Sequence, residues 1–250
     1  MTKTVASARL DRLLANMGYG SRREINNMAR NEEIMLDGAP LLAVEQRIAL
    51  TPDLPQRLEM RGEKLDPLPG MVVMLHKPVA VTCSHKEPGA LVYDLLPQRW
   101  RRREPALSTI GRLDKETSGL LLLTDDGALL HKIISPKSHV AKRYQVVLDR
   151  PLRGDEAEKL AAGKLMLEGE EKPLLPVAMT SSGPQHATVV LHEGRYHQVR
   201  RMFAALGNHV VSLHRDRIGG LDLPDGLKVG EWALVWGDEL AQVFNPGYLS

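Results

Sequence analysis

The spacing of hydrophobic residues near the start of the chain predicts two short helices. Four of them recur at the spacing of one helical face: Leu10, Leu13, Leu14 and Met17. This pattern predicts a helix over residues 7–18, with Gly18 as a natural stop. Ser21 and Glu24 have the spacing of a capping box, so a second helix is expected to begin at Ser21.

Short apolar segments follow these helices. Residues 34–36 and 41–42 flank Asp37-Gly38, a sequence typical of a tight turn between two strands. We therefore expect a small α/β module over residues 1–62. The polar, proline-bearing segment 63–70 is then expected to be a linker.

Residues 71–250 show alternating signals for strands and helices. The segments expected to be apolar runs or strands are 71–75, 80–83, 120–124, 144–148 and 188–191, and those expected to be helices are 129–134, 155–164 and 197–206. Helices separate some of these strands and short turns join others. The pattern predicts an α+β domain built on a mostly antiparallel mixed sheet flanked by helices and loops.

Composition adds a few limits. The chain has 43% hydrophobic and 26% charged residues, a formal net charge of +2 and one cysteine, so a disulfide within the chain is excluded. The first residues contain no apolar segment typical of a secretory signal, and no apolar run is long enough for a membrane span. A reducing, cytoplasmic location is the resulting expectation.

The segment from Gly111 to Gly119, GRLDKETSG, places a carboxylate and an arginine in a loop that leads into a buried strand. Asp114 in this position has the chemistry of a nucleophile or a general base, and Arg112 beside it would favour the ionised carboxylate. The same residues also fit a simple turn with a capping aspartate and a surface ion pair.

Two later segments carry a tyrosine and a cluster of cations. Tyr144 follows Lys142-Arg143 at the start of a strand, where its ring offers a stacking surface for an unpaired base or packs as an ordinary strand tyrosine. In EGRYHQVRRM, Arg200 and Arg201 flank the apolar face of the expected helix. One of them could reach a pocket while the other meets phosphate, or both could be solvated.

Basic residues also gather in the N-terminal module. The candidate phosphate contacts there are Arg9, Arg12, Ser21, Arg22 and Arg23. Arg22 and Arg23 fall in the first turn of the second helix, where they oppose the helix dipole, a placement that favours a nearby phosphate. Ordinary surface charge explains the same residues. His192 and His197 lack further ligands at metal-binding spacing, and no glycine-rich nucleotide motif is present, so neither a metal nor a cofactor is expected.

Taken in order, GRLDKETSGLLLLTDDG, the KRY tripeptide and EGRYHQVRRM closely resemble the pseudouridine synthases. The SRRE-type segment in front resembles an S4 RNA-binding domain, and this pairing resembles the RsuA-type branch that acts on small-subunit ribosomal RNA. The resemblance implies an enzyme that isomerises a uridine of 16S ribosomal RNA to pseudouridine without a cofactor. Its expected partner is ribosomal RNA or a ribosomal assembly intermediate, and a monomer is expected.

The resemblance also implies roles for individual residues. Asp114 would be the catalytic aspartate, Arg112 would hold the nucleotide flipped out, Tyr144 would stack on the uracil, and Arg200 would pair with Asp114. Lys77-Pro78 would be a structural motif beneath the site. The residues of the third motif expected to contact RNA are Arg195, His197 and Arg201.

Three positions depart from the family pattern. Ala80 stands where glycine is usual, which predicts an altered loop path because alanine resists positive φ. Glu32 and Glu33 replace a glycine and a basic residue in the S4-like module. Three other functions stay open: a large-subunit synthase, a non-catalytic RNA-binding assembly factor, and a glycosidase-like hydrolase that would release free uracil.

Overall fold

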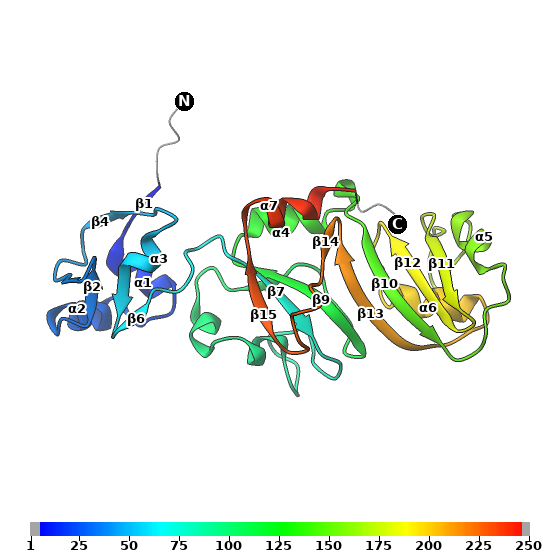
Figure 1. The fold of residues 1–250 in the computed structure, drawn as a ribbon, viewed down its shortest axis with the longest axis horizontal. Coiled ribbons are helices and arrows are strands. Elements are labelled where there is room, and N and C mark those ends of the chain that lie inside the picture. Colours follow the sequence, from blue (N-terminus) through cyan, green and yellow to red (C-terminus); the bar gives the residue numbers. More distant parts are fainter. Residues whose placement is uncertain (1–5, 247–250) are drawn as a thin grey trace, which may run out of the picture. The chain divides into compact units, whose positions relative to one another are not determined.

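The structure, a computed structural model, describes residues 6–246 and comprises two compact units (Figure 1). Within the described residues, the N-terminal unit extends to Met71 and also includes residues 96–108 and 124–126. The large unit contains residues 72–95, 109–123 and the chain from Gly127 onward.

The N-terminal unit packs three helices against two small sheets. Strand β1 (Ser7–Arg9) pairs with β4 (Arg47–Ala49), and the second sheet has the order β3-β2-β5-β6. The other elements are α1 (Leu10–Asn16), α2 (Arg22–Arg30), β2 (Ile34–Leu36), β3 (Ala39–Pro40), α3 (Leu54–Arg57), β5 (Leu58–Met60), β6 (Glu63–Lys64) and the 3-10 helix Gln98–Arg102. Leu10, Leu14, Met17, Ile25 and Leu58 form the fully buried centre of this unit.

The predicted start of the first helix was wrong by three residues. Ser7–Arg9 forms a strand because its backbone pairs with Arg47–Ala49, a partner distant in the sequence. The second helix agrees with the prediction: Ser21 accepts a hydrogen bond from Glu24 N, and the Glu24 carboxylate accepts one from Ser21 N at 2.7 Å. The capping box is therefore confirmed.

The segment predicted as a linker makes specific contacts within the N-terminal unit. It carries β6, and Leu65 is buried in the core of the unit. Asp66 N donates to the Tyr19 hydroxyl at 2.8 Å, and the Asp66 carboxylate accepts a 2.6 Å hydrogen bond from Arg99. The guanidinium of Arg99 in turn lies 4.4 Å from the centre of the Tyr19 ring.

Glu32 and Glu33 lie just after α2. Glu32 has a φ of 58°, so it adopts the left-handed conformation that a glycine after a helix would adopt. The Glu33 carboxylate accepts a 2.5 Å hydrogen bond from Arg61. At this edge the negative charge of Glu33 is therefore balanced within the unit.

The large unit is built on one mixed sheet with the order β11-β12-β10-β13-β9-β7-β15; β14 pairs with β13 and β8 with β9. The strands are β7 (Val72–Lys77), β8 (Ser108–Thr109), β9 (Thr117–Thr124), β10 (Lys142–Leu148), β11 (Ala178–Gly183), β12 (His186–Leu191), β13 (Val210–Ile218), β14 (Leu221–Asp222) and β15 (Trp232–Val235). Strands β13 and β9 run parallel, whereas β10 pairs antiparallel with both β12 and β13. The predicted α+β class with a mostly antiparallel mixed sheet is confirmed.

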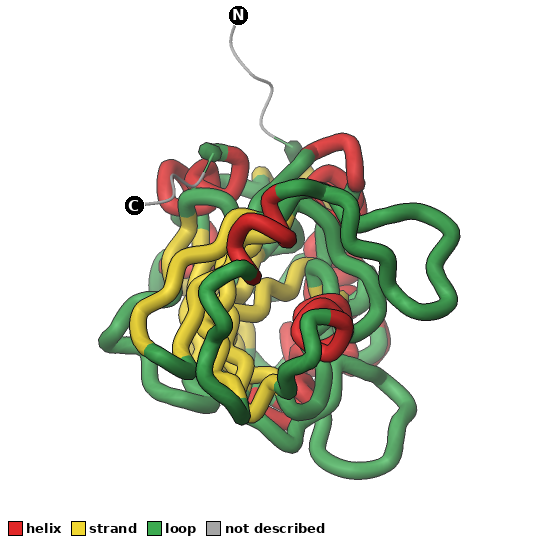
Figure 2. Tube along the Cα trace, turned by 90° about the vertical axis from the view of Figure 1, so that its right-hand side faces the viewer, coloured by secondary structure: helices red, strands yellow, loops and turns green. Residues whose placement is uncertain are grey.

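Helices flank this sheet, as Figure 2 shows. They are α4 (Gly127–Ile134), α5 (Glu156–Ala161), α6 (Gln198–Ala205) and α7 (Gly237–Ala241), with 3-10 turns at Val92–Leu95, Pro136–Ser138 and Gln242–Phe244. As predicted, α6 buries Val199, Met202 and Phe203, which pack against residues of β10, β12 and β13. No helix within 6–246 combines the length and the apolar character needed to cross a membrane.

Candidate active site

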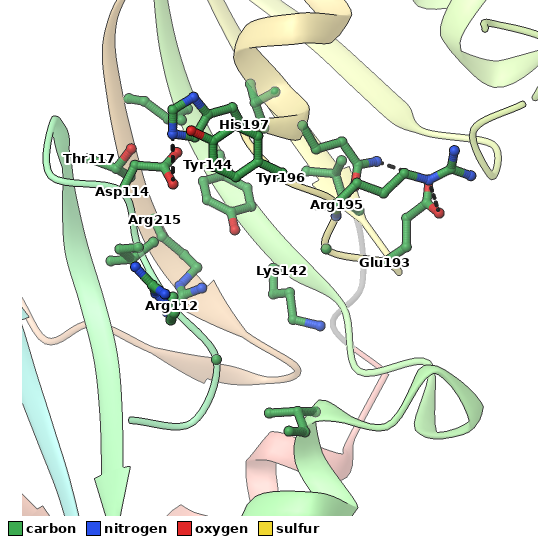
Figure 3. A pocket seen from close by; sticks show the side chains of 18 of the residues that line it. Arg112, Asp114, Thr117, Lys142, Tyr144, Glu193, Arg195, Tyr196, His197 and Arg215 are labelled. Atoms are coloured by element: carbon green, nitrogen blue, oxygen red, sulfur yellow. Dashed lines mark hydrogen bonds and ion pairs between the residues drawn. The ribbon is translucent and has the colours of Figure 1, made fainter. Parts of the chain in front are cut away.

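A cavity of about 810 Å³ opens in the large unit, and Asp114 lies on its wall (Figure 3). Asp114 comes from the loop that precedes β9, and the Asp114 carbonyl accepts a 3.0 Å hydrogen bond from Thr117 N, which closes a tight turn. The following residues Leu120 to Leu123 are fully buried, so the loop is mounted on a rigid strand.

Lys77 anchors this loop from beneath. It is fully buried at the end of β7, and its Nζ lies 3.2 Å from the Asp114 carbonyl and 2.9 Å from the Thr117 carbonyl. The Nζ also reaches the carbonyls of Pro78 at 2.9 Å and Lys115 at 3.4 Å. Burial lowers the pKa of Lys77 from its usual 10.5. Its carbonyl contacts fix the backbone that carries Asp114.

The side chain of Asp114 faces His197, whose Nε2 lies 3.4 Å from Asp114 Oδ1 (Figure 3). His197 precedes α6 and has a φ of 48°, so the turn into the helix directs its ring toward the loop. The Tyr196 ring stacks on His197 at 4.0 Å between ring centres, and Tyr196 is 76% exposed. The carboxylate is therefore bordered by an aromatic pair at the rim of the cavity.

Tyr144 and Arg215 lie on the cavity wall because of strand register. They are direct cross-strand partners in the β10–β13 pair, and a register shift beside Tyr144 marks a bulge there. Arg215 is in turn paired with Gly119 of β9, and a Cβ at Gly119 would meet the Arg215 carbonyl at 2.1 Å. The close approach of these strands thus brings Tyr144, Arg215 and the Asp114 loop to one pocket.

Arg200 does not pair with Asp114, and this prediction was wrong. Its guanidinium donates to the Val210 carbonyl at 2.9 Å and to the Glu116 carbonyl at 2.9 Å. Both acceptors are backbone groups, so Arg200 joins α6 to the start of β13 and to the Asp114 loop. The physical reason is that the open carbonyls of strand ends and turns also accept hydrogen bonds from the five donors of a guanidinium.

Arg112 belongs to the Asp114 loop, and Ala80 contacts this loop. The Arg112 side chain is 68% exposed and lies 3.7 Å from Glu87, so it is placed at the outer rim of the cavity. Ala80 has a φ of 65° and its N donates to the Lys115 carbonyl at 2.8 Å. The predicted altered loop path at Ala80 is wrong, because Ala80 adopts the left-handed backbone expected for glycine.

Arg195 and Arg201 are held by internal partners. Both contact Glu170, at 3.3 Å and 2.8 Å, and both donate to backbone carbonyls of the 168–173 segment. Their geometry favours a role in fastening this segment to α6. Their contact with RNA stays a prediction.

The candidate RNA contacts of the N-terminal unit fall into two groups. Arg9 and Arg22 both pair with the buried Asp11, at 3.0 Å and 2.6 Å, and the hydrogen bond from Arg9 lowers the pKa of Asp11 to about 2. Arg12 and Arg23 are exposed and have no ion pair among the described residues, which leaves their charge open to solvent. Ser21 caps α2 at its exposed N-terminus.

The lining residues that were not selected as site residues from the sequence include Lys142, Tyr196 and Arg215. Burial, and next the charge of Arg215, lower the pKa of Lys142 to about 8. Tyr196 and Lys142 adjoin residues that were selected, so attention to the neighbours of each motif would have found them. Within residues 6–246, no group of three or more histidine, cysteine or acidic residues is placed to hold a metal ion.

Comparison with known proteins gives consistent matches over the chain. The family model of RNA pseudouridylate synthases matches residues 71–205. The chain is 37% identical to the "Ribosomal small subunit pseudouridine synthase A" of Yersinia pestis, over 95% of this chain and 99% of the relative. It is 36% identical to the protein of the same name from Escherichia coli K12 over 94% and 99% of the two chains. A "Crystal structure of pseudouridylate synthase" aligns with a TM-score of 0.65 at 33% identity, covering 94% of this chain and 99% of the other.

Proposed function

Because the chain belongs to the RNA pseudouridylate synthase family, we propose that it isomerises one uridine of small-subunit ribosomal RNA to pseudouridine, with Asp114 as its catalytic carboxylate. The observation that carries the proposal is the position of Asp114 on the wall of a cavity that Tyr144 also lines. A volume of about 810 Å³ is in the range of pockets that enclose a small ligand.

The reaction breaks the bond from ribose C1′ to uracil N1 and forms one from C1′ to C5. The detached base turns within the pocket, C5 loses its proton and N1 gains one, so the atoms of substrate and product are the same. The Asp114 carboxylate either attacks C1′ or removes the proton at C2′ to release the base. Both routes need an ionised carboxylate on the pocket wall.

Binding must offset the cost of removing the target base from its stack, which is a few kcal/mol. Tyr144 provides a ring within the pocket, and stacking of a base on such a ring contributes roughly 1–3 kcal/mol. Arg112, exposed at the rim, is placed to contact phosphate or to fill the space left by the flipped base. Arg12 and Arg23 of the N-terminal unit, which we propose to be an S4-like RNA-binding domain, add contacts to the backbone of the RNA.

Small-subunit ribosomal RNA is the proposed substrate because the full-length relatives from Yersinia pestis and Escherichia coli carry that specificity in their names. We place the enzyme in the cytoplasm as a monomer, in keeping with ribosomal RNA or an assembly intermediate as partner. The domain limits that we propose are 1–62 for the RNA-binding domain and 71–250 for the catalytic domain. The segment 63–70 links them and contributes β6 and Leu65 to the N-terminal unit.

The test is nucleotide-resolution mapping of pseudouridine in ribosomal RNA from cells with and without this protein. We expect one small-subunit site to disappear, to return with the wild type, and to stay absent with Asp114→Asn. Asp225→Asn, a change of an exposed aspartate in another loop, is the matched control and should restore the site.

Each other outcome corrects a specific part of the proposal. Loss of a large-subunit site would overturn the substrate and keep the chemistry. Full activity of Asp114→Asn would overturn the catalytic role. If the wild type and Asp114→Asn both restored ribosome assembly and neither formed pseudouridine, the chain would be a non-catalytic assembly factor. Release of free uracil would indicate a hydrolase.

A further inference from the structure

Among the described residues that line the cavity, Arg215 is the one buried arginine. Its side chain extends from β13, and the residue is 2% exposed. Its Nε donates to the Leu120 carbonyl at 2.9 Å, which fixes the direction of the guanidinium. Its Nη2 is shielded from solvent and has no hydrogen-bond partner.

Burying an N–H group of a cation without a hydrogen-bond acceptor typically costs about 1–3 kcal/mol or more of folding free energy. Such a group calls for a ligand that brings the acceptor. The other buried arginine with an unpartnered nitrogen, Arg103, differs because its guanidinium is neutralised by Asp125 at 2.9 Å. No carboxylate lies within ion-pair distance of Arg215 among the described residues. The hydroxyl of Thr117, on the same wall, is likewise buried without a partner.

We propose that Arg215 Nη2 donates a hydrogen bond to a carbonyl oxygen of the target uracil, so that Arg215 is a base-recognition residue of this site. The inference rests on the proposed function and deepens it by naming the group that contacts the base edge.

The geometry favours the base over a phosphate. Arg215 and Tyr144 are cross-strand partners, and the centre of the guanidinium lies 6.0 Å from the centre of the Tyr144 ring. A base stacked on Tyr144 at ~3.5 Å would bring its edge to the guanidinium. Phosphates, in contrast, stay at the rim of such a pocket, where the exposed Arg112 is found.

The chemistry of the two partners also matches. A guanidinium has only donors, and each carbonyl of uracil is an acceptor. Because the base turns during the reaction, a donor fixed by the Leu120 carbonyl offers a stationary partner while N1 departs and C5 approaches. The contact therefore bears on catalysis as well as on binding.

The experiment is a double-mutant cycle that combines one substitution in the protein with one oxygen-to-sulfur change in the RNA. The wild type and Arg215→Gln are assayed on an RNA fragment with uridine, 2-thiouridine or 4-thiouridine at the target, since sulfur is a weak acceptor. We expect one thio substitution to lower kcat/KM of the wild type at least tenfold and to have little further effect on Arg215→Gln. Non-additivity of this kind indicates direct contact, which a merely structural arginine would not give.

Arg217→Gln, on the same strand and paired with Asp222 outside the cavity, is the matched control and should keep the wild-type sensitivity to sulfur. Equal thio penalties in the wild type and Arg215→Gln, for both RNAs, would overturn the proposal. If the wild type failed to convert the uridine RNA at all, the proposed function would fail instead, before the Arg215 question arises.

A second measurement covers the case in which Arg215→Gln does not fold. A crystal structure of Asp114→Asn bound to the uridine RNA should place a uracil carbonyl within about 3.5 Å of Arg215 Nη2. A base in the pocket whose carbonyls both contact other groups would overturn the proposal.

Discussion

His197 Nε2 lies 3.4 Å from Asp114 Oδ1, so a residue at the start of α6 orients the carboxylate of the loop before β9. His197→Ala should lower kcat about tenfold, the equivalent of about 1.4 kcal/mol in the activation free energy, with little change in thermal stability. His197→Asn should lose less, because asparagine tolerates the left-handed backbone and keeps a donor. His186→Ala, a change of the exposed first residue of β12, is the control in the kinetic assay. Equal activity of all variants would show that Asp114 needs no such partner.

Lys77 also positions the Asp114 loop, since its Nζ donates hydrogen bonds to the carbonyls of Asp114 and Thr117. Lys77→Met keeps most of the side-chain volume but leaves these buried carbonyls without a donor. We expect a loss of about 2–3 kcal/mol in the free energy of unfolding and a fall in kcat that exceeds any rise in KM. Urea unfolding and steady-state kinetics measure both, with the exposed Lys164→Met as control. A variant as stable and as active as the wild type would contradict the anchoring role.

Alanine substitutions at Gly119 and Gly111 test why the motif has two glycines. Gly119 has a φ of 110°, and a Cβ there would lie 2.1 Å from the Arg215 carbonyl, whereas Gly111, at a φ of 73°, has open space around it. Gly111→Ala should cost about 1 kcal/mol from backbone strain alone. Gly119→Ala should cost several kcal/mol or prevent folding, because strands β9 and β13 must separate. Unfolding midpoints that rank the two variants in the reverse order would contradict this account.

The sequence predicted the parts of this structure that depend on near neighbours. The capping box of Ser21 and Glu24 joins residues three apart, and the buried face of α6 follows from helical spacing. The motif that predicts Asp114 is contiguous, and Asp114 lies on the cavity wall. In each case the physical cause, a local hydrogen bond or a period of 3.6 residues, is visible in a short window of sequence.

The parts that were missed depend on pairing between distant segments. Ser7–Arg9 has helix-compatible residues, yet it is a strand because Arg47–Ala49 pairs with it. The central strand β13 buries a charged residue, Arg215, between partly buried polar neighbours, so its pattern does not alternate clearly. Because β13 was not predicted, its register with β10 could not be used to place Arg215 beside Tyr144. For the same reason the sequence could not show that Arg200 contacts the Val210 carbonyl at the start of β13.

We expect Lys142 to make RNA binding in the pocket depend on pH. Burial lowers its pKa to about 8, so the amine loses its charge over a range where ordinary lysines keep theirs. We expect the affinity of the wild type for its RNA fragment to fall between about pH 7 and pH 9. Lys142→Arg, which stays charged, should lose this dependence and keep the affinity, while Lys142→Met should be weak throughout. Equal pH profiles for all three proteins in a binding titration would contradict a charged contact.

The titration of Lys142 should also change protein stability, in the direction opposite to its effect on RNA affinity. The pKa of Lys142 is about 8 in the folded protein and close to 10.5 in the unfolded chain, so between these values the unfolded chain binds more protons. The contribution of Lys142 to the free energy of unfolding should therefore rise with pH across this range, as the penalty for burying a charged amine disappears. Lys142→Met carries no such penalty, so its stability relative to the wild type should be greatest below about pH 8 and should decline toward pH 10. Urea unfolding of both proteins across this range measures the difference, and other titrating groups cancel in the comparison. A difference that is constant with pH would mean that the Lys142 amine keeps its ordinary pKa, and the pH dependence of RNA binding would then need another titrating group.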